Sequence, residues 1–384
     1  MGSVAKRPNG RWRARYRAPD GAWRAKHFTR KVDAERFVAT IETAKLRGAY
    51  IDPDDRTTVA EYARRWAAAR PYRATTARRV EAQIRCHLEG KALGGRRLAA
   101  VLPSDVQAWS AELAQTMAPA TVQLQVNLLK AVYASAVLDR LVASSPVVRI
   151  ALPRAERDRV VPLTIDQVQA LAREVPERCS AMVVVQAALG LRVGELLALR
   201  DQDVNFLGRS VRIEHQLERG TRRRVPPKTP RSRRAVPLPQ VAAEALSEHM
   251  RNWPALDDGT LFYGASGRPY DHAYYGTKVF TAAARRLAGA KGSTFPPEVT
   301  THDLRHHYAS VLLAGGESVV AVAERLGHDN AGMVLRVYGH LMPDSEDHTR
   351  RVIDAAWAPL DGAARVSTGG SGRDGSGTPA GVRP

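Results

Sequence analysis

The sequence of 384 residues predicts a multidomain α+β protein: a small three-stranded sheet with one helix, then an all-α bundle, then a mainly helical unit with a small antiparallel sheet. Arginines alternate with apolar residues at positions 11–18, which is the period of a strand. Helical periodicity then extends across residues 59–139. From Thr164 onward, helical segments surround two stretches with the composition of strands, residues 210–217 and 234–238.

The first expected domain, residues 1–50, combines the small sheet with a helix. Turn signals bound the arginine-rich strand on both sides, residues 22–28 predict the returning strand, and a short strand near Val4 completes the sheet. A helix is expected at residues 32–47. The segment carries 13 Lys or Arg against 4 Asp or Glu, a net charge of +9, and the strand period places four arginines on one face: Arg11, Arg13, Arg15 and Arg17.

Residues 56–150 are expected to form a second, all-α domain. Periodicity predicts four helices in it, near residues 59–66, 75–87, 104–113 and 119–139. Thr75 and Ser104 are the predicted N-caps of two of them, and Pro119 suits the first turn of the last.

The remaining chain divides into three parts. Residues 151–162 mix proline with alternating charge, which predicts a linker. Residues 163–360 are long enough to bury a core of their own and form the third expected domain. Residues 361–384 lack large apolar side chains, so we expect a disordered tail.

The composition favours a polyanionic partner. The formal net charge is +19 and the isoelectric point is near 10.4, which predicts salt-dependent binding to nucleic acid. The longest apolar stretch, residues 181–191, is too short to span a bilayer, and no secretory leader precedes the first strand. We therefore expect a cytoplasmic protein without a membrane partner. Cys86 and Cys179 lack the spacing of a disulfide framework or a zinc site.

Six polar side chains of the C-terminal half supply what is needed to cut and rejoin a phosphodiester without a metal ion. Such a cleavage needs an in-line nucleophile, stabilisation of negative charge on the non-bridging oxygens and a proton for the leaving alkoxide. The groups lie in ALGLRVGELLALRDQDV, PPKTPRSRRAVPLP, TTHDLRHHYASVLLAGG and AERLGHDNAGMVLRVYGHL. They are two guanidiniums, an ammonium, two imidazoles and a phenol: Arg192, Lys228, His302, Arg305, His328 and Tyr338.

These four motifs resemble those of the tyrosine recombinases, or phage integrases, and the resemblance runs from near the N-terminus to about residue 355. Two positions depart from the usual pattern, Leu189 and Asp201, and neither is catalytic. The resemblance implies an arm-type DNA-binding domain at residues 1–50, a core-binding domain at residues 56–150 and a catalytic domain at residues 163–360.

Each catalytic group then has an expected role. Arg192 and Arg305 would hold the phosphate oxygens, because a guanidinium fork binds two of them at once. Lys228, expected in a hairpin turn between two strands, would protonate the leaving 5′ oxygen. His302 would accept the phenol proton or hydrogen-bond the transition state, and His328 would hydrogen-bond the phosphate.

The nucleophile is the remaining group. Tyr338 alone follows the Leu-Gly-His element at the family spacing, although five other tyrosines are candidates by residue type: Tyr263, Tyr270, Tyr274, Tyr275 and Tyr308. A phenol is a weak nucleophile at neutral pH, so it needs a neighbouring base and a cationic site.

Local sequence also predicts how the histidines are presented. Thr300 to Asp303 form a possible capping box at the start of the helix that carries His302, and Gly327 can end the helix before His328. His306 and His307 are expected to be packing or hydrogen-bonding residues. The spacing of His302 and His306 also occurs in zinc sites, but the glutamate of that motif and a third ligand are missing.

The resemblance implies a phage or mobile-element integrase without a cofactor that acts as a homotetramer on double-stranded DNA, at core-type and arm-type sites. Such an integrase would form a 3′-phosphotyrosyl intermediate and a Holliday junction. A directionality factor and a host DNA-bending protein are possible partners of an enzyme of this kind. The apolar residues at 352–357 would pack against a neighbouring copy or against their own protomer. The predicted DNA-contacting residues are Arg11, Arg13, Arg15, Arg17, Arg24, Lys26, Arg78 and Arg79.

Three other functions remain as alternatives. A type IB topoisomerase uses similar chemistry but relaxes supercoils without site preference. A non-catalytic DNA-binding protein would never become covalently attached to DNA. A chromosome-dimer resolvase lacks the arm-binding domain predicted at the N-terminus.

Overall fold

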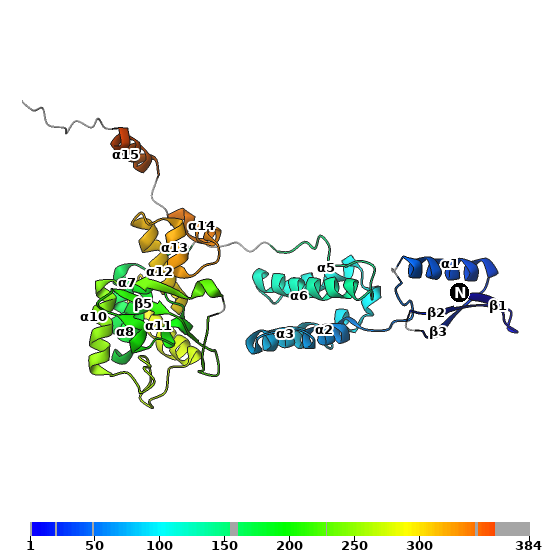
Figure 1. Cartoon of the computed structure of the whole chain (residues 1–384), viewed down its shortest axis with the longest axis horizontal. Helices are drawn as coiled ribbons and strands as arrows, with labels where there is room; N and C mark the ends of the chain where they lie inside the picture. The colour runs from blue at the N-terminus through cyan, green and yellow to red at the C-terminus, as the bar shows by residue number, and fades with distance from the viewer. Residues whose placement is uncertain are drawn as a thin grey trace, which may run out of the picture. The chain divides into compact units, whose positions relative to one another are not determined.

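The computed structural model describes residues 2–19, 21–47, 50–153, 160–227, 229–341 and 345–357. The chain divides into two compact units, residues 1–158 and 159–384 (Figure 1). Lys228, part of the predicted linker and the predicted disordered tail lie outside the described residues. The α+β class expected from the sequence is confirmed, whereas the division into three functional domains stays a prediction.

A three-stranded antiparallel sheet opens the first unit, with strands β1 (Ser3–Lys6), β2 (Trp12–Arg17) and β3 (Trp23–Phe28) in that order. Helix α1 (Lys31–Leu46) lies across one face of the sheet (Figure 1). Ala14 and Tyr16 of β2 are fully buried on this face, and the Tyr16 ring meets Phe37 of α1 edge to face at 5.7 Å. The predicted alternation is therefore present, because the apolar side chains of β2 point toward α1.

The rest of the first unit is a helical bundle: α2 (Val59–Ala68), α3 (Ala74–His87), α4 (Ala92–Gly95), the 3-10 turn η1 (Leu98–Ala100), α5 (Pro103–Ala114) and α6 (Pro119–Leu138). Tyr133 and Leu129 of α6 are buried at its centre. Pro119 begins α6 as predicted, but the N-caps predicted at Thr75 and Ser104 are wrong.

Both misplaced caps lie one residue inside their helices. Arg73 precedes α3 in extended conformation, and Leu102 precedes α5. Pro103 takes the first helical position of α5, where its fixed φ angle is favourable. The carboxylate of Asp105, three positions after Leu102, accepts the backbone N–H of Leu102 at 2.9 Å. This contact stabilises the start of α5, where the expected serine cap is absent.

The second unit is mainly helical. Its small antiparallel sheet has the order β4-β5-β8, with β4 (Val204–Asn205), β5 (Ser210–Ile213) and β8 (Arg234–Pro237), and β6 (Gln216–Leu217) pairs with β7 (Arg224–Val225). The helices are α7 (Ile165–Glu174), α8 (Glu177–Leu189), α9 (Val193–Leu197), α10 (Gln240–Asn252), the π-helix η4 (Tyr274–Thr281), α11 (Ala282–Gly289), α12 (Thr301–Ala314), α13 (Val319–Leu326), α14 (Ala331–Tyr338) and α15 (Ser345–Trp357), with 3-10 turns η2 (Asp201–Asp203), η3 (Pro230–Ser232) and η5 (Gly339–Leu341).

Helix α8 is the central element of the second unit. Its side chains are buried around most of its circumference, and it packs against α7, α10 and α12. A helix that is apolar on all sides must be enclosed by other elements, which explains why α8 lies in the middle. In the described part of the chain, none of the helices has the length and apolar character required to cross a bilayer.

Candidate active site

Gly190 positions the first predicted catalytic residue. It ends α8 with φ +62°, a left-handed conformation that favours glycine, and the chain then turns into α9 with Arg192 at its N-cap. A Cβ atom at Gly190 would lie 2.3 Å from the ring of Tyr308, so the position also requires the absence of a side chain. Both constraints fix where the Arg192 side chain starts.

Arg192 is held by one carboxylate and one carbonyl. Its Nη1 donates to Glu195 Oε1 at 2.8 Å, and its Nη2 donates to the carbonyl oxygen of Gly327 at 3.2 Å. The local pair with Glu195 that the sequence allows is therefore present. The side chain nevertheless stays 37% exposed, so the guanidinium remains accessible to a phosphate.

Glu195 joins Arg192 to a second arginine that the sequence analysis did not identify. Arg234 on β8 donates from Nη2 to Glu195 Oε2 at 2.9 Å, and both side chains are buried. Burial by itself raises the pKa of Glu195, but Arg234 and Arg192 lower it further than burial raises it, so the carboxylate stays charged. Arg234 lies two residues before the buried Val236, so both side chains point to the same face of strand β8. This spacing in the sequence could have indicated that Arg234 points inward.

Replacing Glu195 by alanine is expected to lower the free energy of unfolding by about 3–5 kcal/mol, because Arg234 would keep its charge in a buried place without a carboxylate. Urea unfolding of the full chain measures the loss. Glu248→Ala is the matched control, since Glu248 is an exposed acid on α10 and its removal should change stability by less than about 0.5 kcal/mol. Equal losses in the two variants would contradict a structural role of the Glu195 network.

Arg305 on α12 is buried and is held by backbone carbonyls at two helix ends. Only 1% of the residue is exposed, its Nη1 donates to the Gly190 carbonyl at 2.7 Å, and its Nη2 donates to the Leu326 carbonyl. Burial, and then the neighbouring Arg192, lower the pKa of Arg305 to about 9, so it remains charged at neutral pH. The helix ends thus fix the direction of a buried fork.

The two histidines of the predicted set lie close to both arginines. Gly327 ends α13 with φ +64°, as expected, and His328 follows it with a buried Nδ1 that has no hydrogen-bond partner among the described residues. Burial, Arg305 and Arg192 lower the pKa of His328 to about 4. The predicted capping box of Thr300 and Asp303 starts α12 and positions His302, whose pKa is lowered by desolvation, His306 and Arg305.

Tyr338 ends α14 and is buried, with 2% of the residue exposed. Its hydroxyl forms a hydrogen bond of 2.6 Å with Nδ1 of His306 on α12. Burial raises the pKa of Tyr338 to about 12, although Arg305 opposes this change. His306 was expected only to pack or hydrogen-bond, and its position one turn after His302 was the signal that it faces the same region.

The structure therefore brings together five of the six predicted residues through helix ends: Arg192, His302, Arg305, His328 and Tyr338. Lys228 lies outside the described residues. His307 lies apart from this group, with Nδ1 bound to the Leu163 carbonyl. In the described ranges, no three His, Cys, Asp or Glu side chains form a cluster able to hold a metal ion.

The predicted DNA-contacting residues of the sheet divide between its two faces. Arg13, Arg15 and Arg17 pair across to His27, Ala25 and Trp23 and share the face away from α1, where Arg15 stacks on the Trp23 ring at 4.3 Å. The register places two others, Arg24 and Lys26, opposite the buried Tyr16 and Ala14.

Those two cations therefore project toward the side of α1. Arg24 forms an ion pair with Asp52, and the Lys26 ammonium lies 5.2 Å from the centre of the Phe37 ring. Of the remaining predicted contacts, Arg11 is exposed just before β2, and Arg78 and Arg79 are exposed on α3.

Family models match most of the described chain. Residues 154–344 match the phage integrase family, and residues 1–48 match the N-terminal domain of phage integrases. The chain belongs to the phage integrase family. A relative of this integrase, the putative prophage phiRv2 integrase of Mycobacterium tuberculosis strain H37Rv, is 26% identical over 350 residues, 88% of this chain and 91% of the relative. Other relatives are named tyrosine recombinases, and the integrase is a tyrosine-type site-specific recombinase.

The fold of the integrase is similar to that of two solved DNA complexes. A Tn1549 transposon integrase fragment in complex with a circular intermediate DNA has a TM-score of 0.68 at 23% identity, over 78% of this chain and 99% of that one. A lambda integrase tetramer bound to a Holliday junction has a TM-score of 0.58 at 18% identity, over 89% and 95%. At these identities the likeness establishes the fold of the integrase.

Proposed function

We propose that this integrase recombines DNA at defined sites through a 3′-phosphotyrosyl intermediate on Tyr338 and a Holliday junction. The phenol attacks the phosphorus, forms a 3′ ester and frees a 5′ hydroxyl. The free hydroxyl of a second strand then attacks the ester and restores a phosphodiester. Because the ester keeps the energy of the broken bond, the exchange requires neither ATP nor a divalent ion.

The convergence of two guanidinium forks on one neutral imidazole supports this proposal most directly. Arg192 and Arg305 both act on the pKa of His328, and Arg305 also acts on the pKa of Tyr338. A phosphate between these groups would receive charged donors on its non-bridging oxygens and have the phenol nearby as nucleophile. His302, close to the same two arginines, would add a further hydrogen bond.

A nicked DNA substrate that loses a short fragment after cleavage tests the proposal, because the lost fragment prevents religation. The core sequence is selected from a randomised library by binding to the full chain. We expect a covalent protein–DNA adduct at one phosphate of the selected site, with a free 5′ hydroxyl on the released fragment. In a separate reaction with supercoiled plasmid, relaxation without site preference would indicate a topoisomerase instead. Binding of the nicked substrate without any adduct would indicate a non-catalytic protein.

Lys228 is proposed as the general acid on the basis of its motif alone. Lys228→Ala is expected to slow single-turnover cleavage about 100-fold, the usual contribution of a positioned acid, and to change DNA binding far less. A substrate with sulfur at the 5′ bridging position supplies a better leaving group, so it should restore cleavage by the variant. Lack of restoration would remove the general-acid role.

The DNA contacts are proposed from the charge of the first unit. The sheet face with Arg13, Arg15 and Arg17 would enter a groove of arm-type DNA, and Arg78 and Arg79 on α3 would contact the backbone of core-type DNA. We accordingly assign residues 1–50, 56–150 and 163–360 to arm binding, core binding and catalysis. A cytoplasmic location and accessory DNA-bending or directionality partners belong to the same proposal.

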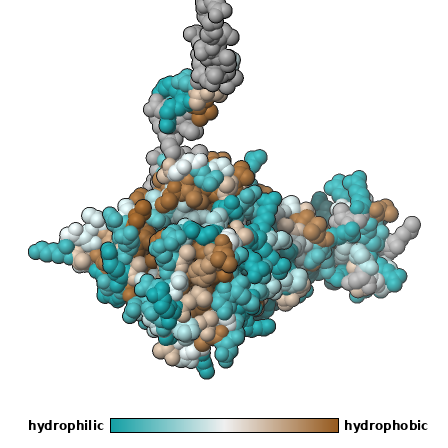
Figure 2. Space-filling view, turned by 60° about the vertical axis from the view of Figure 1, so that its left-hand side comes forward, coloured by the Kyte–Doolittle hydropathy of each residue, from teal (hydrophilic) through white to brown (hydrophobic). Residues whose placement is uncertain are grey.

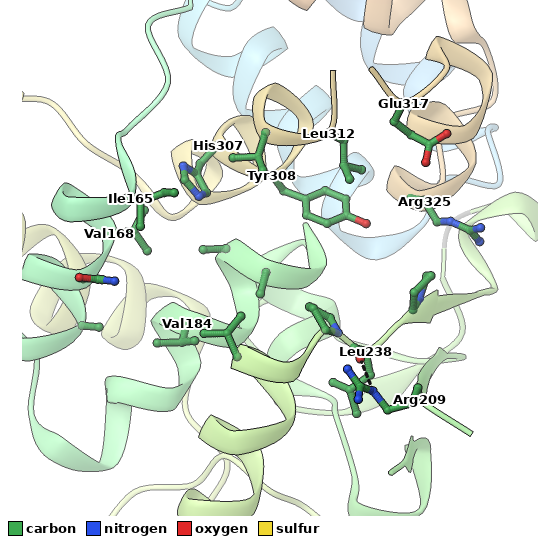
Figure 3. Close-up of a pocket in the computed structure, with 18 of the residues that line it drawn as sticks. Ile165, Val168, Val184, Arg209, Leu238, His307, Tyr308, Leu312, Glu317 and Arg325 are labelled. Carbon is green, nitrogen blue, oxygen red and sulfur yellow. Dashed lines mark hydrogen bonds between the residues drawn. The ribbon is translucent and has the colours of Figure 1, made fainter. Parts of the chain in front are cut away.

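Helix α15 and a groove in the second unit support assembly into a tetramer. Val352, Ile353 and Trp357 of α15 are exposed. Figure 2 shows hydrophobic and hydrophilic surface side by side on the described part of the second unit. A largely apolar groove of about 990 Å³ is lined by α7, α8, α12 and the segment after β8. In Figure 3, Tyr308 and Leu312 face Val184 and Leu238 across it. We propose that the groove of one copy receives α15 of a neighbouring copy, because a helix with exposed apolar side chains can place them in an apolar groove.

Trp357→Asp is expected to weaken assembly on paired core sites by at least about 2 kcal/mol, roughly a 30-fold loss, because a large aromatic anchor would be replaced by a charge. Analytical ultracentrifugation of DNA complexes measures the change, and binding of one copy to a single half-site should be unaffected. Leu207→Asp is the control, since Leu207 is an exposed apolar residue outside the groove. Unchanged assembly of the Trp357 variant would contradict the proposal.

A further inference from the structure

The hydrogen bond between α12 and α14 joins the proposed nucleophile to a histidine outside the six predicted residues. His306 Nδ1 lies 2.6 Å from the hydroxyl oxygen of Tyr338, and the two rings meet edge to face at 5.5 Å. His302 lies one turn earlier on α12, with its ring centre 4.7 Å from that of His306. The imidazole in direct contact with the reacting oxygen is therefore that of His306.

The direction of this hydrogen bond follows from the two environments. Burial lowers the pKa of His306, Asp303 partly opposes this change and Arg305 adds to it, so the imidazole is neutral at neutral pH. The phenol of Tyr338 keeps its proton, because its own pKa is raised. The phenol consequently donates and Nδ1 accepts, which requires the imidazole proton to be on Nε2.

A base is needed at this position because the phenol ionises poorly by itself. With a pKa of about 12, only about one phenol in 10⁵ would be ionised at pH 7. We propose that His306, rather than His302, accepts the proton of the Tyr338 hydroxyl as the phenol attacks the phosphorus. This assignment rests on the proposed function, since it takes Tyr338 as the nucleophile.

The step balances in protons and bonds. The O–H bond of Tyr338 breaks and its proton moves to Nδ1 of His306, while a bond forms between the phenol oxygen and phosphorus. The bond from phosphorus to the 5′ oxygen breaks, and that oxygen takes a proton from the acid proposed at Lys228. In religation the His306 imidazolium returns its proton to the departing phenolate, so one residue serves as base in one direction and acid in the other.

His302 has a different place in this scheme. It lies at the start of α12, close to Arg192 and Arg305, the groups assigned to the phosphate. His306 faces the phenol instead. The two histidines of one helix face would thus act on different atoms, His302 on the phosphate oxygens and His306 on the nucleophile.

His306→Asn provides the test variant, because the side-chain oxygen of asparagine replaces Nδ1 as hydrogen-bond acceptor but does not take up a proton at neutral pH. Cleavage of the nicked substrate is followed in single turnovers by the full chain. We expect the variant to cleave about 100-fold more slowly than the wild type and to bind the DNA equally well. Cleavage at the wild-type rate would overturn the assignment.

A more acidic nucleophile separates a base from a structural contact. Incorporation of 3,5-difluorotyrosine at position 338 lowers the phenol pKa. It should therefore raise the cleavage rate of the His306→Asn variant at least tenfold. The His302→Ala variant keeps His306 as the base, so fluorination of Tyr338 should not raise its cleavage rate in this way. If fluorination changes the His306 variant and the wild type by the same factor, His306 only holds the tyrosine in place and the assignment falls.

The controls distinguish this inference from the proposed function. Wild-type protein that forms an adduct, and Tyr338→Phe protein that forms none, establish the nucleophile independently of His306. Failure of the wild type to form an adduct would remove the proposed function itself. His306→Ala with added imidazole gives a second measurement if the asparagine variant does not fold, and rescue of cleavage by imidazole is then the expected result.

Discussion

Tyr338→Phe is expected to abolish the covalent protein–DNA adduct while DNA binding is retained. The change removes one oxygen atom and leaves the ring in its place among Val334, Leu326 and the other buried residues of α13 and α14. His306 loses one hydrogen-bond partner, which costs about 1 kcal/mol of stability, too little to unfold the domain. Denaturing gel electrophoresis of the reaction with nicked core DNA measures the adduct.

Tyr308→Phe is the matched control for this experiment. Tyr308 is a buried tyrosine of the same apolar cluster, on α12, and it is one of the alternatives that residue type allows. Its variant should form the adduct at the wild-type level. An adduct that persists in Tyr338→Phe, or disappears in Tyr308→Phe, would show that another phenol is the nucleophile.

Arg192→Ala is expected to slow cleavage about 1,000-fold, the upper range for the loss of one transition-state donor. Because Arg192 is more than one third exposed, and Glu195 keeps Arg234 as a partner, we expect the fold to persist. Arg192→Lys keeps the charge but not the fork, so its rate should lie between those of the alanine variant and the wild type. Rapid-quench single-turnover kinetics measures all three.

A modified substrate identifies the atom on which Arg192 acts. Replacing one non-bridging oxygen of the scissile phosphate by a methyl group removes the charge that the guanidinium is proposed to stabilise. On this neutral substrate, the cleavage rate of Arg192→Ala should fall much less below that of the wild type. A full 1,000-fold loss on the neutral substrate would contradict the assignment and indicate that Arg192 acts through protein structure alone.

The sequence predicted those parts of the site that local chemistry determines. The αL glycine before His328, the capping box at Thr300 and the alternation in β2 each depend on a few neighbouring residues. The family motifs also predict that Arg192, Arg305 and Tyr338 share one site. Capping rules and the spacing of the family motifs were sufficient to predict these positions, because each residue lies at a helix end or on a defined helix face.

The partners of these residues could not be predicted from local sequence. Arg234 reaches Glu195 from a strand 39 positions away, and His306 meets Tyr338 across 32 positions. Such pairs depend on how α9, α12, α14 and β8 pack, which periodicity does not specify. The pairing register of β2 and β3 likewise decides which cations of the sheet share a face, and it assigns Arg24 to the side of α1.

The carbonyl contacts of Arg305 have a consequence for the free protein. The carbonyls of Gly190 and Leu326 orient the guanidinium but carry no formal charge, so they neutralise it less than a carboxylate would. Without DNA, neighbouring cations therefore repel each other inside the folded protein. A bound polyanion relieves that repulsion. The repulsion between these cations therefore lowers the thermal stability of the free protein, and its relief contributes to the affinity for DNA.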